Sequence, residues 1–403
     1  MSVYAQNLLR ELVALGHEVT MISQFRGDET GTRVYGGGPP PAVPGVRVIG
    51  LEALGEQELP VANFERDIDQ MVQTAVAEHA RTPFDLLHAQ YGYPTGLAAL
   101  ETSKRLGLPN VVSIQGGDGH WVGVDCCETH REAMRVVLNH AGALLIGSRS
   151  FAEEVRENHG TPPERWTIVP GAVDAARFSP RETWQTGEWV DPAQPTILYH
   201  GRVDRRKGAL DLLDAFGTLR RRGHGLAQRA RLLYSGIGPD SDAVAERVQA
   251  LGLCDAFTSL GYVDYADVPA VYRKADLFAS PTYSEGFSNT ILEAMSAGLP
   301  IVSCHAVGVV DCLRDGENGL LVQPGDIHSL ADALGRLLDD APLRRRLAEC
   351  AFEEVHRLYS WPVVARQIAG VYEEIRATAP DNDWTLRAPL DPTCRYRTAP
   401  HLL

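Results

Sequence analysis

The chain contains 403 residues, of which 44% are hydrophobic and 22% are charged, as in ordinary folded enzymes and unlike disordered or fibrous chains. Acidic residues outnumber basic residues 52 to 38, and the net charge of -14 argues against broad binding to nucleic acid or anionic lipid. The length exceeds what one hydrophobic core usually supports, so we expect two α/β domains. An anionic ligand must therefore meet a local basic pocket.

The 7 cysteines are scattered and odd in number, and no zinc-type CxxC pair occurs. We therefore expect neither a disulfide framework nor a structural metal site. Cys126 and Cys127, followed by His130, are a poor metal site because two adjacent thiols rarely face one ion. No apolar run approaches the roughly 18 residues of a membrane helix, and no signal sequence is evident, so we expect a cytoplasmic protein.

The first predicted element is an amphipathic helix with Val3, Leu8, Leu9, Leu12 and Leu15 on one side. After it, strands are predicted at 19–22, 85–88, 111–114 and 144–146, with a helix at 131–141. This alternation is typical of a Rossmann-like domain, except that no strand precedes the first helix. A strand and its loop need on the order of ten residues, so we expect the true start to lie upstream of Met1.

The second half repeats strand, loop and helix. It begins with a strand at 196–199, a turn at Gly201 and a helix carrying Leu210, Leu213 and Phe216. Further strands are predicted at 232–234, 277–279 and 300–303. Such alternation predicts a doubly wound parallel sheet, which binds ligands at the carboxyl ends of its strands.

Proline and glycine residues between 168 and 180 predict a connection between two domains. We place an N-terminal domain at 1–174 and a C-terminal domain at 175–359. Residues 360–403 are expected to form a helix that crosses back to the N-terminal domain, followed by a loose tail. Ser360-Trp361-Pro362 should interrupt the last helical stretch.

The segment 284–300 reads as a strand end, a glycine-containing loop and a helix start. Glu285 lies in the loop and Glu293 about one turn inside the helix, so one carboxylate could hold a sugar and the other a ribose. Taken alone, such a pair is more typical of a solvent-facing helix start. Backbone amides at the positive helix end could hold a diphosphate without a metal, and they belong to Gly286, Phe287, Ser288 and Asn289.

The segment 201–208, Gly-Arg-Val-Asp-Arg-Arg-Lys-Gly, makes this acidic chain locally basic between a strand and a helix. Arg202 and Lys207 can neutralise a diphosphate, the guanidinium in bidentate geometry and the ammonium as a point charge. These two cations would replace a divalent metal. Arg205 and Arg206 are interpreted as a solvated turn, the usual role of a charge run.

Together these segments resemble the family 4 retaining glycosyltransferases of the group 1 type. The glycine-arginine, lysine-glycine and E-x7-E elements of that family match Gly201-Arg202, Lys207-Gly208 and Glu285 to Glu293 in order and spacing. The resemblance covers nearly all of residues 85 to 375. It implies the GT-B fold, with two Rossmann-like domains that face each other across a cleft.

By this resemblance, Arg202 and Lys207 bind the diphosphate of a nucleotide sugar, beside Gly201, Gly236 and the amides of 286–289. Glu285 orients the donor sugar and Glu293 binds the ribose. The resemblance implies transfer to a glycan, a lipid-linked acceptor or a small molecule, with peripheral membrane contact in the lipid case. It implies no resident cofactor and no divalent metal.

In the retaining mechanism proposed for this family, the acceptor attacks and the leaving group departs on one face of an oxocarbenium-like sugar. The leaving phosphate can take the acceptor proton, and basic groups stabilise its charge. Asp67-Ile68-Asp69 and Asp381-Asn382-Asp383 have the spacing of a metal-binding DxD motif. They fall in a predicted helix and in the tail, and we interpret both as surface features.

The family often has a histidine after the strand at 111–114, and this sequence has Gln115 there. Either Gln115 contacts the donor sugar or His120 reaches the site, so His120 is the fourth candidate catalytic residue beside Glu285, Arg202 and Lys207. His88 is interpreted as structural, and His200 as a residue that shapes the turn at Gly201.

Two alternatives remain. A GT-B sugar-nucleotide epimerase would share the fold, but it would need a further set of acid and base groups. A noncatalytic sugar-nucleotide-binding subunit would bind the donor without turning it over. The E-x7-E pattern favours transfer over both.

Overall fold

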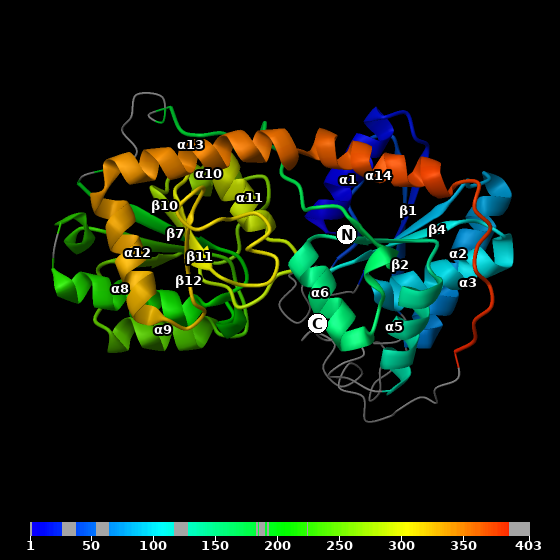
Figure 1. Cartoon of the computed structure of the whole chain (residues 1–403), viewed down its shortest axis with the longest axis horizontal. Helices are drawn as coiled ribbons and strands as arrows, with labels where there is room; N and C mark the ends of the chain where they lie inside the picture. The colour runs from blue at the N-terminus through cyan, green and yellow to red at the C-terminus, as the bar shows by residue number, and fades with distance from the viewer. Residues whose placement is uncertain are drawn as a thin grey trace. The chain divides into compact units, whose positions relative to one another are not determined.

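The computed structural model describes residues 2–25, 38–53, 64–116, 128–182, 184, 190–191, 193–223 and 225–386. Contacts divide the chain into two compact units (Figure 1). Unit 1 comprises Met1–Pro170 and Val364–Leu403, and unit 2 comprises Gly171–Val363. The boundaries we placed after residues 174 and 359 each lie four residues from these divisions.

The described residues of unit 1 form two parallel sheets. β1 (Val19–Phe25) pairs with β2 (Val46–Glu52), and a four-stranded sheet follows the order β3-β4-β5-β6. The four strands are β3 (Leu87–Gln90), β4 (Asn110–Ile114), β5 (Ala143–Ile146) and β6 (Trp166–Ile168). The α-helices described in the N-terminal part of the unit are α1 (Val3–Ala14), α2 (Phe64–Arg81), α3 (Leu97–Leu106), α5 (Glu128–His140) and α6 (Arg149–His159).

Burial in unit 1 is greatest in the two central strands of the four-stranded sheet, β4 and β5. All five residues of β4 are buried, as expected of a continuous apolar run in such a sheet. Leu8, Leu9 and Leu12 of α1 are also buried, whereas Leu15 follows the end of the helix and is exposed. The strand predicted at 85–88 lies two residues further along, and β2 and β6 were not predicted.

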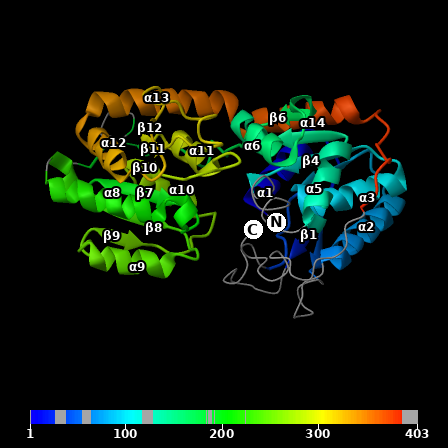
Figure 2. The same cartoon turned by 60° about the horizontal axis from the view of Figure 1, so that its bottom comes forward.

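Unit 2 is built on one six-stranded parallel sheet in the order β12-β11-β10-β7-β8-β9 (Figure 2). Its strands are β7 (Thr196–His200), β8 (Arg231–Ser235), β9 (Phe257–Ser259), β10 (Leu277–Ser280), β11 (Ile301–Cys304) and β12 (Leu320–Val322). The α-helices that lie wholly among the described residues of this unit are α8 (Ala209–Arg222), α9 (Ser241–Ala250), α10 (Val268–Arg273), α11 (Asn289–Ser296), α12 (Ile327–Asp339) and α13 (Ala341–Leu358). The prediction of a doubly wound parallel sheet is confirmed.

The core of unit 2 follows directly from the sequence pattern. Ile197 and Leu198 of β7, Leu213 and Phe216 of α8, and Phe278 of β10 are completely buried. The order of the sheet reverses at β7, because the chain passes from β7 to β8 and β9 on one side and returns to β10 on the other. Ligands of doubly wound sheets bind at such a reversal.

The last long helical stretch is interrupted where the sequence predicted it. α13 ends at Leu358 and α14 (Trp361–Ile375) begins three residues later. Ser360, between them, forms an isolated parallel bridge with Val173. No helix in the described part of the chain is both long enough and apolar enough to cross a membrane.

Candidate functional site

Three loops of unit 2 meet at the carboxyl edge of its sheet. Loop 201–208 follows β7, loop 236–240 follows β8, and loop 281–288 follows β10. Backbone hydrogen bonds join them: the amide of Val203 donates to the carbonyl of Ile237 (3.1 Å), and that of Tyr283 donates to Arg206 (2.9 Å). The predicted site residues of unit 2 therefore converge at the sheet reversal.

Loop 201–208 contains a short 3₁₀ turn that its own sequence caps. The carboxylate of Asp204 accepts a hydrogen bond from the amide of Arg206 (2.9 Å), and the turn covers Arg205–Lys207. Gly208 ends the turn at φ 70°, pressed against the carbonyl of Pro281, which a Cβ would overlap. This glycine lets the basic loop lie directly on the loop that follows β10.

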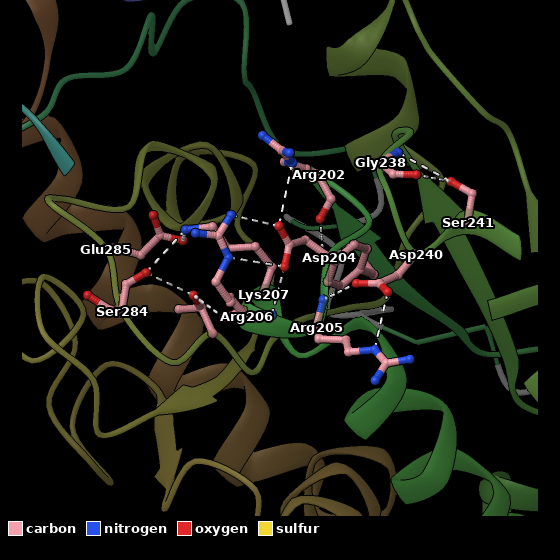
Figure 3. Close-up of polar contacts among 12 residues, drawn as sticks. Arg202, Asp204, Arg205, Arg206, Lys207, Gly238, Asp240, Ser241, Ser284 and Glu285 are labelled. Atoms are coloured by element: carbon pink, nitrogen blue, oxygen red, sulfur yellow. Dashed lines mark hydrogen bonds and ion pairs between the residues drawn. The ribbon is translucent and has the colours of Figure 1, made fainter. Parts of the chain in front are cut away.

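Lys207 and Glu285 form the central contact of the site. The ammonium Nζ of Lys207 lies 2.8 Å from Oε1 of Glu285 and donates to the carbonyl of Ser284 at 3.1 Å (Figure 3). Both side chains are partly exposed. The fold thus places a cation of the basic loop beside the first carboxylate of the E-x7-E pair.

Asp204 organises the arginines of the loop. It is buried and accepts from the guanidinium of Arg206 (2.9 Å), and its carboxylate lies 3.5 Å from Nε of Arg202. Burial opposes ionisation of Asp204, but hydrogen bonds from the side chain and backbone of Arg206 outweigh it and hold the pKa of Asp204 below its usual value. Arg202, the predicted diphosphate ligand, therefore stands next to a charged aspartate (Figure 3).

Arg205 and Arg206 are exposed, as the interpretation of a solvated turn requires, but each is also ion-paired. Arg206 binds Asp204, and Arg205 lies 3.2 Å from Asp240 of loop 236–240. The amide of Arg205 also donates to the Asp240 carboxylate (2.7 Å). These two arginines therefore help to shape the loop that carries Arg202 and Lys207.

Gly236 is required for the approach of two loops. Its φ of 138° is strained for a residue with a side chain, and a Cβ would overlap the carbonyl of Gly201. The amide of Gly201 in turn donates to the carbonyl of Ser235 at 3.0 Å. Gly201 and Gly236 thus pack directly against each other at this edge of the sheet.

The N-terminus of α11 lies at the same edge as the basic loop. Ser288 occupies the N-cap position, but its side chain makes no capping hydrogen bond to the helix. The first-turn amides, beginning with Asn289, thus receive no capping oxygen from Ser288, and they form the positive end of the helix dipole. Such an end suits an anion.

Glu293 lies one turn inside α11 and is buried. Its carboxylate accepts a hydrogen bond from the hydroxyl of Tyr272 (2.8 Å), a residue of α10. Burial raises the pKa of Glu293 to about 7, while the Tyr272 bond and the charge of Arg177 act in the opposite direction. A buried carboxyl group whose pKa is raised in this way, near the loops at the edge of a sheet, is typical of a binding site.

Comparison with known proteins identifies the family. Residues 181–354 match the model of the glycosyl transferases group 1, and residues 1–172 match a glycosyl transferase 4-like domain. The D-inositol 3-phosphate glycosyltransferase of Stackebrandtia nassauensis is 30% identical over an alignment of 322 positions that covers 75% of this chain and 72% of that protein. The chain belongs to the group 1 glycosyltransferases.

A second relative matches most of the chain, and two solved structures have a similar fold. The D-inositol 3-phosphate glycosyltransferase of Corynebacterium kroppenstedtii is 26% identical over 402 residues, covering 93% of this chain and 85% of that protein. Sucrose-phosphate synthase from Thermosynechococcus elongatus has a TM-score of 0.77 at 24% identity and 94% coverage of both chains. Anabaena HepE in complex with UDP and glucose has a TM-score of 0.65 at 18% identity, covering 82% and 86%. The glycosyltransferase has the GT-B fold of two Rossmann-like domains.

The unit 1 candidates of the glycosyltransferase divide into described and undescribed residues. His120, Trp121 and the pair Cys126-Cys127 lie outside the described residues. Gln115 follows β4, and its amide donates to Gln90 at 2.5 Å. His88 of β3 is half-buried and lies 2.8 Å from the hydroxyl of Ser113 and 2.6 Å from that of Tyr372, and desolvation lowers its pKa to about 4.

One interpretation is wrong: Asp67 of α2 is not a surface residue but is completely buried. The amphipathic pattern of α2 places Asp67 beside Ile68, Met71 and Val72, which are also buried. Asp381 and Asp383, by contrast, are exposed as predicted.

Sequence reasoning missed two residues that shape the glycosyltransferase site. Asp204 could have been found, because an aspartate before a short turn is a typical N-cap. Tyr272 could not, because it lies 21 residues from Glu293 on another helix and only the fold brings the two together. His200 was interpreted as shaping the turn; its ring lies 3.0 Å from the hydroxyl of Ser235.

Proposed function

We propose that this glycosyltransferase moves a sugar from a nucleoside diphosphate sugar to an acceptor hydroxyl, with retention of configuration and without a divalent metal. The contact of Lys207 with Glu285 carries the proposal. In a nucleotide sugar the diphosphate is bonded directly to the sugar ring. A phosphate-binding cation and a sugar-binding carboxylate at 2.8 Å match that neighbourhood.

The chemistry needs no covalent protein intermediate. The bond between the sugar anomeric carbon and the diphosphate oxygen breaks, and its electron pair stays on the leaving phosphate. The acceptor oxygen forms the new bond on the same face, and its proton passes to the leaving phosphate oxygen. Lys207, Arg202 and the first-turn amides of α11 stabilise the negative charge that develops there.

The cations of loop 201–208 take the place of a metal in this proposal. The diphosphate would displace Glu285 as the partner of Lys207 and free that carboxylate to accept sugar hydroxyls. Arg202 offers a planar fork of donors to two phosphate oxygens. Glu293 binds the ribose hydroxyls at the other end of the donor.

The acceptor proposal comes from the relatives, which are named D-inositol 3-phosphate glycosyltransferases. We infer that a hydroxyl of a phosphorylated polyol of this kind is the first acceptor to examine. None of the site contacts described above involves a nucleotide base, so the donor is identified by experiment.

The experiment measures transfer from a panel of UDP-, GDP- and ADP-sugars to D-inositol 3-phosphate in the presence of EDTA. Hydrolysis of each donor is measured without acceptor. The protein is compared with Glu285→Ala and Arg202→Ala, and the anomeric configuration of the product is determined by NMR. Turnover in EDTA that both variants lose, with retained configuration, is the expected result.

Other outcomes separate the alternatives. Activity restored only by added magnesium or manganese would refute metal independence, and an inverted product would refute retention. Binding of a nucleotide sugar without transfer or hydrolysis would instead indicate a noncatalytic binding subunit, and conversion of the donor to its epimer would indicate an epimerase.

A further inference from the structure

Two tyrosines form a stacked pair inside unit 2, beneath the basic loop. Tyr199 of β7 and Tyr234 of β8 are partners in the sheet register. Their rings stack with centroids 4.6 Å apart at an interplanar angle of 27°, and both residues are buried. Neither residue belongs to the site described above.

The hydroxyls of this tyrosine pair reach the two ends of one segment. Tyr199 donates to the backbone carbonyl of Arg202 at 2.6 Å, and Tyr234 donates to the carbonyl of Ala209 at 2.5 Å. The segment between these anchors carries the Asp204 turn and Lys207. The pair thus holds the loop at the point where Arg202 leaves the sheet and again where α8 begins.

Both hydroxyls remain protonated donors at any working pH. Burial, together with nearby carboxylates such as that of Asp211 for Tyr234 and Glu285 for Tyr199, raises the pKa of each tyrosine well above its usual value. Burying a hydroxyl costs free energy unless it forms a hydrogen bond. Each of these hydrogen bonds therefore fixes a tyrosine ring and a loop carbonyl relative to each other.

We propose that Tyr199 and Tyr234 are positioning residues for diphosphate binding, which act through Arg202 and Lys207 respectively. This inference rests on the proposed function, because it assumes that those two cations bind the diphosphate. The stacked rings support the loop, and their two hydrogen bonds fix the backbone at Arg202 and Ala209. The positions of the Arg202 guanidinium and the Lys207 ammonium follow from that backbone.

The test uses Tyr199→Phe and Tyr234→Phe, which keep the ring and its stacking and remove one hydrogen bond each. UDP, GDP and ADP are titrated by calorimetry, and the one that binds the unchanged protein most tightly is compared with its parent nucleoside. The ratio of the nucleoside Kd to the nucleoside diphosphate Kd measures the contribution of the diphosphate. Each variant should lower this ratio about fivefold, the size of one hydrogen bond, with nucleoside binding unchanged.

Double-mutant cycles then show the route of the effect. In the Arg202→Ala background, Tyr199→Phe should no longer lower the ratio, because its intermediary is gone. In the Lys207→Ala background, the same is expected of Tyr234→Phe. Losses that simply multiply in both backgrounds would overturn the inference.

Ser296→Ala is the matched control. The buried hydroxyl of Ser296 donates to the carbonyl of Phe178 at 2.6 Å, outside the basic loop. It should lower the melting temperature without changing the ratio. An equal loss of nucleoside and nucleoside diphosphate affinity in the tyrosine variants would reduce their role to general stability.

The outcomes also distinguish this inference from the proposed function. If Arg202→Ala and Lys207→Ala leave the ratio unchanged, the diphosphate site itself is wrong. If Arg202→Ala and Lys207→Ala reduce the ratio to about one while both phenylalanine variants leave it unchanged, only the positioning role of the tyrosine pair is wrong.

Discussion

Glu293, the proposed ribose ligand, shows at the scale of one residue how a buried carboxylate opposes stability. Its pKa is about 7 in the folded protein and near 4.5 when unfolded, so the folded state binds more protons between these values. Its contribution to stability is therefore most favourable below about pH 4.5 and is lost as the pH rises to about 7. Above about pH 7 the Glu293 carboxylate is ionised although it is buried, and this charge lowers the stability of the folded protein.

Glu293→Gln should therefore stabilise the protein at pH 8 by up to about 3 kcal/mol, because the neutral amide removes a buried charge from the folded state. The gain should fade as the pH is lowered toward 4.5. Affinity for a nucleoside diphosphate should fall at the same time, because an ionised acceptor of ribose hydroxyls is lost. Thermal unfolding and calorimetric titration at pH 8 and pH 5 measure both effects, and a variant that is less stable at pH 8 would contradict the argument.

Lys207 is the second residue whose replacement has a defined result. Lys207→Met should reduce kcat about 100-fold or more, since it removes a charge that stabilises the leaving diphosphate. It also leaves Glu285 without its cation. Lys274→Met is the control, because Lys274 is an exposed lysine of the same unit. Steady-state transfer rates compare the two, and similar losses would mean that net charge, not the site, is responsible.

At the scale of elements, the loops are tied together by glycines that the sequence displays plainly. Gly236→Ala should push loop 236–240 away from the Gly201 carbonyl and so lower nucleotide affinity. Gly252→Ala is a close control, because Gly252 also has a positive φ, of 66°, but a Cβ there meets nothing within 4 Å. Both variants should lose about 1 to 2 kcal/mol of stability from backbone strain. Only the Gly236 variant should lose nucleotide binding, as measured by calorimetry.

Four strands of unit 2, β7, β8, β10 and β11, could be predicted closely because each contains a short apolar run. The predicted strand at 196–199 becomes Thr196–His200, and that at 232–234 becomes Arg231–Ser235. The E-x7-E and lysine-glycine spacing also identified the loops of the site. Local pattern suffices here because each loop carries its own candidate ligands.

Other features required the fold. β9 and β12 have only three residues each, too few for a periodic pattern. The bond from Tyr272 to Glu293 and the stacking of Tyr199 on Tyr234 join elements distant in sequence. Asp67 was misjudged because a charge in a helix is normally exposed, and only packing shows that this one is buried.

For the whole molecule, the division into two units predicts that nucleotide binding can be separated from sugar transfer. Residues 171–363, expressed alone, contain every described residue of the proposed donor site. They should fold and bind a nucleoside diphosphate with a Kd within about tenfold of that of the full chain, because the nucleotide's contacts lie within one domain with its own core. They should transfer no sugar. Calorimetry and a transfer assay test this, and an unfolded fragment, seen by circular dichroism, would show that unit 2 depends on unit 1.

The bridge between Val173 and Ser360 brings the two ends of unit 2 together. The amide of Val173 donates to the carbonyl of Tyr359 at 2.9 Å, so the two ends of the unit are neighbours. A coding segment for such a unit can be cut out and replaced with both joins falling at one spot. Recombination between related genes could then change the donor while the other half of the enzyme is inherited intact, and laboratory chimaeras could use the same two joins.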